Sequence, residues 1–148
     1  MDIDRVVFED LFAGSDDPWG FRTRWYESRK RALTLACLPA ARYARAFEPG
    51  CANGELTAAL ATRCDQVLAS DGVAAAVLLA QQRLNGLGLT NVSVAQAWVP
   101  QDWPAQTFDL IVFSEFGLQR AVDGIAVQLE AGDGMAPMAG QQGAAGAE

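Results

Sequence analysis

The stretch that decides the fold is Phe47-Glu48-Pro49-Gly50-Cys51-Ala52-Asn53-Gly54. It follows a short strand candidate, residues 44–48, and precedes an alanine- and leucine-rich run, residues 55–61, whose composition favours a helix. Its glycines allow the backbone to turn tightly and a ligand to approach closely. The spacing is ExGxxxG, which matches neither the GxGxxG dinucleotide pattern nor a phosphate loop. Taken alone, the stretch is either a plain strand-to-helix turn or a ligand-binding loop.

Strands and helices alternate outward from this turn. The pattern predicts helices over residues 4–13, 19–38, 55–61 and 73–84, and strands over residues 44–48, 66–70, 92–96 and 108–114. In the helix over 19–38, the helical spacing brings Trp25, Leu33 and Cys37 near one face. Alternation at this spacing is typical of βαβ units with right-handed crossovers. The sequence therefore predicts an α/β fold with a doubly wound, Rossmann-like parallel sheet.

The pattern weakens after Gly117, and this divides the chain into three parts. Residues 1–45 are expected to form an N-terminal helical cap, residues 46–117 the α/β core, and residues 118–148 a divergent, disordered tail. Within the tail, residues 118–129 could still form one helix. The sheet is then incomplete at its C-terminal edge, and the bare strand over 108–114 should favour self-association. The chain reads as truncated or frame-shifted after about residue 117.

Composition excludes several classes of function. The net charge of −7 argues against a nucleic-acid-binding surface, and no apolar run is long enough for a membrane span. The chain has no histidine and three cysteines without a CxxC pair, so no metal site is expected. Seven of the eleven basic residues lie between Arg22 and Arg45, either on a solvated helix or as a cationic lip over a ligand. The cytoplasm is the expected location.

Asp71 is the second feature that indicates a ligand. It ends the strand over 66–70 and follows Gly54 by 17 residues, since 71 − 54 = 17. An acid at about this distance from a glycine loop can accept hydrogen bonds from both hydroxyls of a ribose. The competing interpretation is that Asp71 caps the helix that follows. Together with the glycine loop, Asp71 favours nucleoside binding.

The chain resembles the class I S-adenosylmethionine-dependent methyltransferases, and within them the nodulation protein S family of N-methyltransferases. The class-level resemblance rests on residues 46–54, Asp71, and the run Phe108-Asp109-Leu110-Ile111-Val112-Phe113-Ser114-Glu115. The narrower one rests on Trp25-Tyr26-Glu27-Ser28-Arg29-Lys30, Val99-Pro100-Gln101-Asp102-Trp103-Pro104 and Ser114-Glu115-Phe116-Gly117. The resemblance covers about residues 8–117 and implies a methyltransferase-type Rossmann-like sheet with S-adenosyl-L-methionine as its cofactor.

The resemblance also implies roles for individual residues. The loop would hold the methionine part of the cofactor through Glu48, Gly50, Cys51, Asn53 and Gly54. Asp71, with Gly72 beside it, would hold the ribose. Ala97 and Trp98 would flank the adenine, where many relatives have an acid that binds the exocyclic amine. Here stacking or a backbone contact must replace that hydrogen bond.

Residues outside the loop complete the implied site. Trp19 and Arg29 would close over the cofactor, with Arg29 reaching its carboxylate. Trp19 could equally be a core aromatic, and Arg29 a solvated surface charge. At the end of the last strand, Ser114 would contact the cofactor. Glu115 would bind the acceptor amine and favour loss of its proton, although it could also be an acid at a helix start.

The resemblance implies N-methylation of an amine on a small molecule, an amino sugar or an oligosaccharide. Methyl transfer is a direct displacement that depends on in-line positioning of a neutral nucleophile. The family's further strands help to build the acceptor pocket, and residues 118–148 do not resemble them. One alternative is therefore an inactive remnant that only binds the cofactor. Another is a nucleotide-binding oxidoreductase module, which the ExGxxxG spacing disfavours.

Overall fold

The strand that precedes the glycine turn lies at the centre of a five-stranded sheet. The computed structural model describes residues 3–18, 20–113 and 127–128. The sheet order is β3-β2-β1-β4-β5, with β1 (Tyr43–Pro49) between β2 (Cys64–Asp71) and β4 (Leu110–Val112). The strands β3 (Val92–Gln96), β2, β1 and β4 are parallel, and β5 (Val127–Gln128) is antiparallel to β4. The alternation of strands and helices confirms the predicted parallel, Rossmann-like α/β fold.

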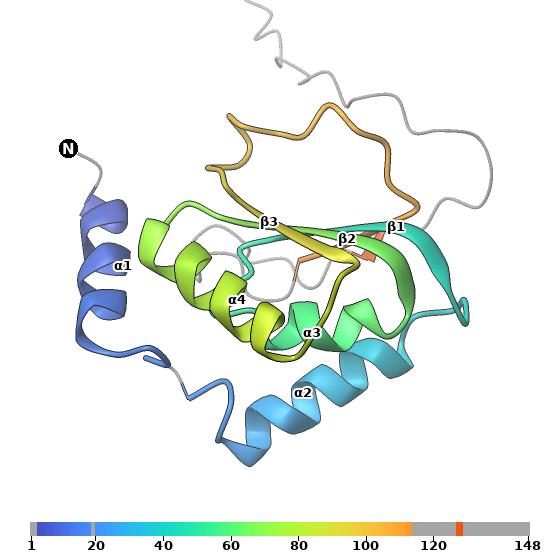
Figure 1. Ribbon diagram of the computed structural model, residues 1–148, viewed down its shortest axis with the longest axis horizontal. Helices are drawn as coiled ribbons and strands as arrows, with labels where there is room; N and C mark the ends of the chain where they lie inside the picture. The colour runs from blue at the N-terminus through green and yellow to red at the C-terminus, as the bar shows by residue number, and fades with distance from the viewer. Residues whose placement is uncertain (1–2, 19, 114–126, 129–148) are drawn as a thin grey trace, which may run out of the picture.

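The described helices lie on one side of this sheet (Figure 1). They are α1 (Ile3–Gly14), α2 (Trp25–Ala36), α3 (Glu55–Ala61) and α4 (Ala74–Gly86). The segment between β3 and β4 runs along the other face (Figure 1), where Trp103 and Phe108 pack on Phe47 of β1. The main core lies between α3 and the strands β1, β2 and β4, and a second cluster joins α4 to β2.

The N-terminal segment corrects the predicted helix over 19–38. Helix α2 begins only at Trp25, because the preceding residues form a turn around Gly20, whose φ is +69°. The Asp17 carboxylate accepts hydrogen bonds from the backbone N–H groups of Phe21 and Arg22 and stabilises this turn. A side chain that satisfies these donors offers the backbone an alternative to helix.

The predicted strand over 108–114 is longer than the strand observed. Strand β4 covers Leu110–Val112. The preceding Asp109 uses its carboxylate to accept hydrogen bonds from the backbone N–H groups of Ala44 and Arg45, at 2.8 and 2.7 Å. The side chain of Asp109 therefore ties the start of β1 to the start of β4.

The expectation of a bare edge at β4 is wrong. Strand β5 pairs with it, with Gln128 opposite Ile111 and Val127 opposite Val112. The expected helix over residues 118–129 is accordingly wrong at residues 127–128, which form a strand. An edge strand presents unpaired backbone N–H and C=O groups, and a two-residue strand of any composition can satisfy some of them.

Candidate functional site

The glycine turn after β1 is fixed to the end of β2 by backbone hydrogen bonds. The N–H groups of Gly50 and Cys51 both donate to the carbonyl oxygen of Ser70, at 2.7 and 2.9 Å. Gly50 and Gly54 have φ values of +73° and +82°, in the left-handed region that favours glycine. The turn at residues 50–54 therefore lies directly beside the carboxyl end of β2, the edge at which open α/β sheets bind ligands.

Asp71 connects the turn to the start of α4. One carboxylate oxygen accepts a hydrogen bond from the N–H of Ala52, and the other from the N–H of Val73, each at 3.0 Å. The N-cap residue of α4 is Val73, so Asp71 ties the turn together without occupying the N-cap position. Burial raises the pKa of Asp71, against these hydrogen bonds, which lower it. Each oxygen retains a lone pair for another donor.

Glu48 is a second carboxyl at this edge and is 1% exposed. The hydroxyl of Thr57 on α3 donates to its Oε2 at 2.6 Å. Burial raises the pKa of Glu48 to about 8, the Thr57 hydrogen bond opposes that rise, and the charge of Asp71 adds to it. Cys51, also buried, has a thiol whose pKa is raised by burial and then by Glu48 and Asp71. A cation is the ligand charge that this pair of acids favours.

Asn53 joins the turn to the N-terminal segment. Its amide nitrogen donates to Asp17 Oδ1 at 3.0 Å and to the carbonyl oxygen of Asp16 at 3.4 Å. Its own Oδ1 is buried and has no hydrogen-bond partner, and the same is true of the Ser70 hydroxyl beside the turn. Buried polar atoms nearly always have partners, so these two are available for a polar ligand.

The turn after β3 forms the third side of the site. The N–H of Ala97 donates to the carbonyl oxygen of Asp71 at 2.9 Å, so this turn lies against the end of β2. The indole of Trp98 covers Gly72 so closely that a Cβ atom there would overlap its ring. Phe12 of α1 belongs to the same apolar cluster, which brings the first helix to the site. An aromatic wall thus adjoins Asp71, and the role of Ala97 and Trp98 beside an adenine stays a prediction.

The structure does not bring all the predicted residues together. Arg29 lies on the exposed surface of α2, with its guanidinium 5.7 Å from the centre of the Trp25 ring. Trp19, Ser114 and Glu115 lie outside the described residues, so their assigned roles stay predictions.

The basic residues between Arg22 and Arg45 are largely engaged in separate contacts, which favours the solvated interpretation over a cationic lip. Lys30 pairs with Glu27 on the same helix, and Arg42 pairs with Asp65. The guanidinium of Arg31 donates to the carbonyl oxygen of Phe21.

Three residues that the sequence analysis missed form hydrogen bonds with residues in or next to the site. Thr57 contacts Glu48, and Asp17 contacts Asn53. Glu55, at the start of α3, accepts hydrogen bonds from Arg22 and Arg83, each at 3.0 Å. These contacts join segments 9 to 36 residues apart, and no local pattern reports them. Only the folded structure brings these residues to the site.

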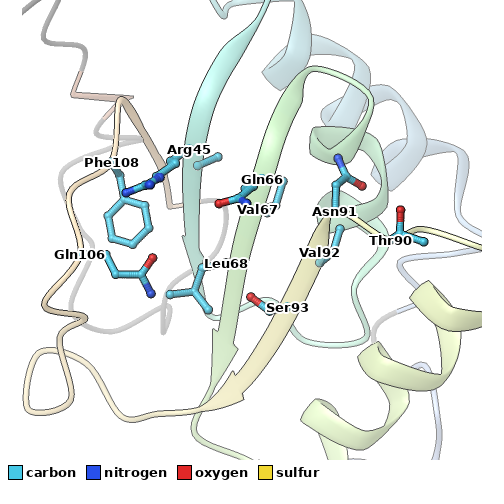
Figure 2. Close-up of a pocket in the computed structure, with 11 residues that line it drawn as sticks. Arg45, Gln66, Val67, Leu68, Thr90, Asn91, Val92, Ser93, Gln106 and Phe108 are labelled. Carbon is cyan, nitrogen blue, oxygen red and sulfur yellow. The ribbon is translucent and has the colours of Figure 1, made fainter.

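A pocket of about 230 Å³ lies elsewhere, on the face of the sheet opposite α3 and α4 (Figure 2). Arg45, Gln66 and Ser93 contribute polar side chains to it, and Phe108 borders it (Figure 2). These residues lie away from the carboxyl ends of the strands, where Gly50 to Gly54 and Asp71 meet. The candidate site is therefore the strand edge, and this pocket is separate from it.

A model of the nodulation protein S family matches residues 5–123. The chain belongs to this family. Nodulation protein S of Rhizobium tropici is a curated relative, 32% identical over 102 residues, which are 68% of this chain and 42% of that protein. The chain thus spans less than half the length of this curated nodulation protein S.

Two solved structures are similar to the chain. A candidate methyltransferase from Pseudomonas syringae is 58% identical, with a TM-score of 0.58, over 66% of this chain and 62% of that one. The N-methyltransferase NodS of Bradyrhizobium japonicum, crystallised with S-adenosyl-L-homocysteine, is 29% identical, with a TM-score of 0.67, over 74% of this chain and 55% of that one. Within the described residues, no helix has the length and apolar content needed to cross a bilayer.

Proposed function

We propose that this chain binds S-adenosyl-L-methionine at the carboxyl ends of β1 and β2, and that the protein transfers a methyl group to an amine. The observation that carries the proposal is the convergence of two carboxyl groups, the buried Glu48 and the half-buried Asp71, on one glycine turn. Membership of the nodulation protein S family supports the same function, as does the NodS complex with S-adenosyl-L-homocysteine.

The residues present suit this cofactor. Its methionine part carries an ammonium and a carboxylate, its ribose offers two hydroxyls, and its adenine is a flat aromatic. Glu48 suits the ammonium, and Asp71 has lone pairs left for the hydroxyls. The unpartnered Asn53 Oδ1 can accept a further hydrogen bond. Trp98 offers an aromatic surface next to Gly72. Gly50 and Gly54 leave room for a close approach.

When bound, the cofactor supplies an activated methyl group on a positively charged sulfur. The chain's own residues contribute positioning, which is most of what a direct displacement requires. The turn is held rigid by Ser70 and Asp71, so the ligand would meet donors and acceptors that are already in place. We assign Glu115 the role of binding the acceptor ammonium and favouring its deprotonation. Trp19, Arg29 and Ser114 remain proposed cofactor contacts.

The proposed acceptor is an amine on a small molecule, an amino sugar or an oligosaccharide. The family name and the N-methyltransferase activity in the name of the Bradyrhizobium japonicum protein support an amine. Cytoplasmic location belongs to the same proposal. It is supported by the three cysteines, all of which are free thiols, because free thiols persist in a reducing compartment.

Equilibrium titration tests the cofactor. By isothermal calorimetry, the chain should bind S-adenosyl-L-homocysteine and leave NAD unbound at the same concentration. Binding of NAD alone would replace the proposal with a nucleotide-binding oxidoreductase module.

Turnover tests the transfer step. The chain is incubated with S-adenosyl-L-methionine and a chitooligosaccharide bearing a free amine, and mass spectrometry detects the methylated product. Cofactor binding without turnover on any amine tested would favour a chain that only binds the cofactor.

A further inference from the structure

The contact between Glu48 and Thr57 is more enclosed than any other polar contact at the site. Thr57 is 0% exposed and Glu48 is 1% exposed, and they meet at 2.6 Å across the packing of α3 on β1. Within the described residues, Thr57 supplies the only side-chain hydrogen bond to Glu48, and no lysine or arginine pairs with it. A carboxylate without a cation in such a place depends strongly on each donor that it has.

We propose that Thr57 is a positioning residue for Glu48, and that its hydroxyl fixes the orientation of the carboxyl group and favours the charged form, which accepts the cofactor's ammonium group. This inference deepens the proposed function and rests on it. The hydroxyl does not reach the ligand in this account. It acts through Glu48, by donating to Oε2 and leaving Oε1 to accept from the ligand.

The groups around Glu48 determine in which direction its pKa changes when the Thr57 hydroxyl is removed. Burial and the charge of Asp71 at the end of β2 both disfavour a charged Glu48, while the hydroxyl of Thr57 from α3 favours it. The pKa of Glu48, about 8, therefore rises further when the Thr57 hydroxyl is removed. A protonated Glu48 cannot pair with an ammonium group, so cofactor affinity at neutral pH should fall with that rise.

Variants of Thr57, Thr62 and Glu48 isolate this effect. Thr57→Val removes the hydroxyl at nearly constant volume, and Thr57→Ser restores it. Thr62→Val is the matched control, because the Thr62 hydroxyl donates to the Ala59 carbonyl oxygen at the exposed end of the same helix. Glu48→Gln, made alone and combined with Thr57→Val, removes the titrating group. Circular dichroism confirms folding, and Thr57→Ala takes the place of the valine variant if that one does not fold.

The first measurement needs no cofactor. Carbon-13 NMR of the Glu48 carboxyl across pH 5 to 10 should give a midpoint near 8 in the wild type. The midpoint should rise by about one pH unit in Thr57→Val, and it should stay near the wild-type value in Thr57→Ser and Thr62→Val. An unchanged midpoint in Thr57→Val would overturn the inference whether or not the chain binds the cofactor.

The second measurement is the pH profile of S-adenosyl-L-homocysteine affinity. The ratio of the Kd of Thr57→Val to that of the wild type should be about ten at pH 7 and approach one above pH 9, since one pKa unit is a factor of ten. The ratio cancels the titration of the ligand itself. In the Glu48→Gln background, Thr57→Val should change nothing. A ratio constant with pH would show a merely structural role, and wild type that fails to bind would instead reject the proposed function.

Discussion

The carboxyl ends of β1 and β2 and the surface of α2 reverse the usual pattern of burial. At the strand ends the acid Glu48 is 1% exposed, whereas on α2 Trp25 is 76% exposed. Leu33 of α2 and Cys37, which directly follows this helix, are also exposed. Folding alone favours neither arrangement, because buried acids and solvated aromatics both cost stability. The difference favours the strand ends over α2 as the place for a ligand, and it indicates that α2 obtains little of its stability from its aromatic side chains.

The largest effect expected at the strand ends is that of Gly50→Val. A β-branched residue is strained at a φ of +73° and fills the space that the cofactor's methionine part needs. Binding of S-adenosyl-L-homocysteine by calorimetry should be lost. Gly88→Val is the matched control, because Gly88 has a φ of +69° but no neighbour near its Cβ position. If both variants are equally destabilised yet bind normally, the turn has no role in binding.

The second prediction concerns stability in relation to pH. In the folded chain the pKa of Glu48 is about 8, against an ordinary 4.5, so folded Glu48 keeps a proton that the unfolded chain releases between these values. The free energy of unfolding should therefore fall by a few kcal/mol as the pH rises from about 4.5 to 8. Urea unfolding of Glu48→Gln should show a flatter profile, with the remaining slope due in part to Asp71, whose pKa is also raised. Parallel profiles for the variant and the wild type would contradict the buried state of Glu48.

The third prediction separates two carboxylates with similar contacts. Asp71 and Asp109 each accept hydrogen bonds from two backbone N–H groups, but they lie at opposite ends of β1. Asp71→Ala should weaken S-adenosyl-L-homocysteine binding by about 1.5–3 kcal/mol, the cost of losing charge-assisted hydrogen bonds. Asp109→Ala should lower stability and leave affinity unchanged. Equal affinities for the two variants in calorimetry would remove Asp71 from the site.

The smallest effect is expected on α2. Trp25→Ala removes an exposed ring and its contact with Arg29, so the free energy of unfolding should change by less than about 1 kcal/mol. Phe47→Ala serves as the reference, because Phe47 is fully buried and should cost about 3–5 kcal/mol. Thermal unfolding of the two variants compares them. A large loss in Trp25→Ala would mean that the α2 surface is covered in the folded protein.

Local signals predicted the elements near the glycine turn well. The expected helix over 55–61 and strand over 92–96 agree with α3 and β3 at both ends. Both are bounded by residues that break regular structure, Gly54 before the helix and a Gly-rich turn ahead of the strand. The approach of Asp71 to the turn followed from the general rule that parallel strands end at one edge.

Contacts between distant segments explain what the sequence could not predict. The late start of α2 depends on Asp17, which also contacts Asn53. Strand β5 pairs through its backbone, which has no side-chain signature. The hydrogen bond from Thr57 to Glu48 depends on how α3 lies over β1. The contacts of Asp17 with Asn53 and of Thr57 with Glu48, and the backbone pairing of β5, are not reported by periodicity.

Trp98, after β3, packs directly on Gly72, after β2, so the size of one residue limits the size of the other. A larger residue at position 72 would displace the indole, and a smaller residue at position 98 would leave a hole above the glycine. Among evolving relatives these two positions should therefore change as a pair, with a bulkier residue at one accompanied by a smaller residue at the other. Such covariation would make the contact between positions 72 and 98 detectable from sequences alone.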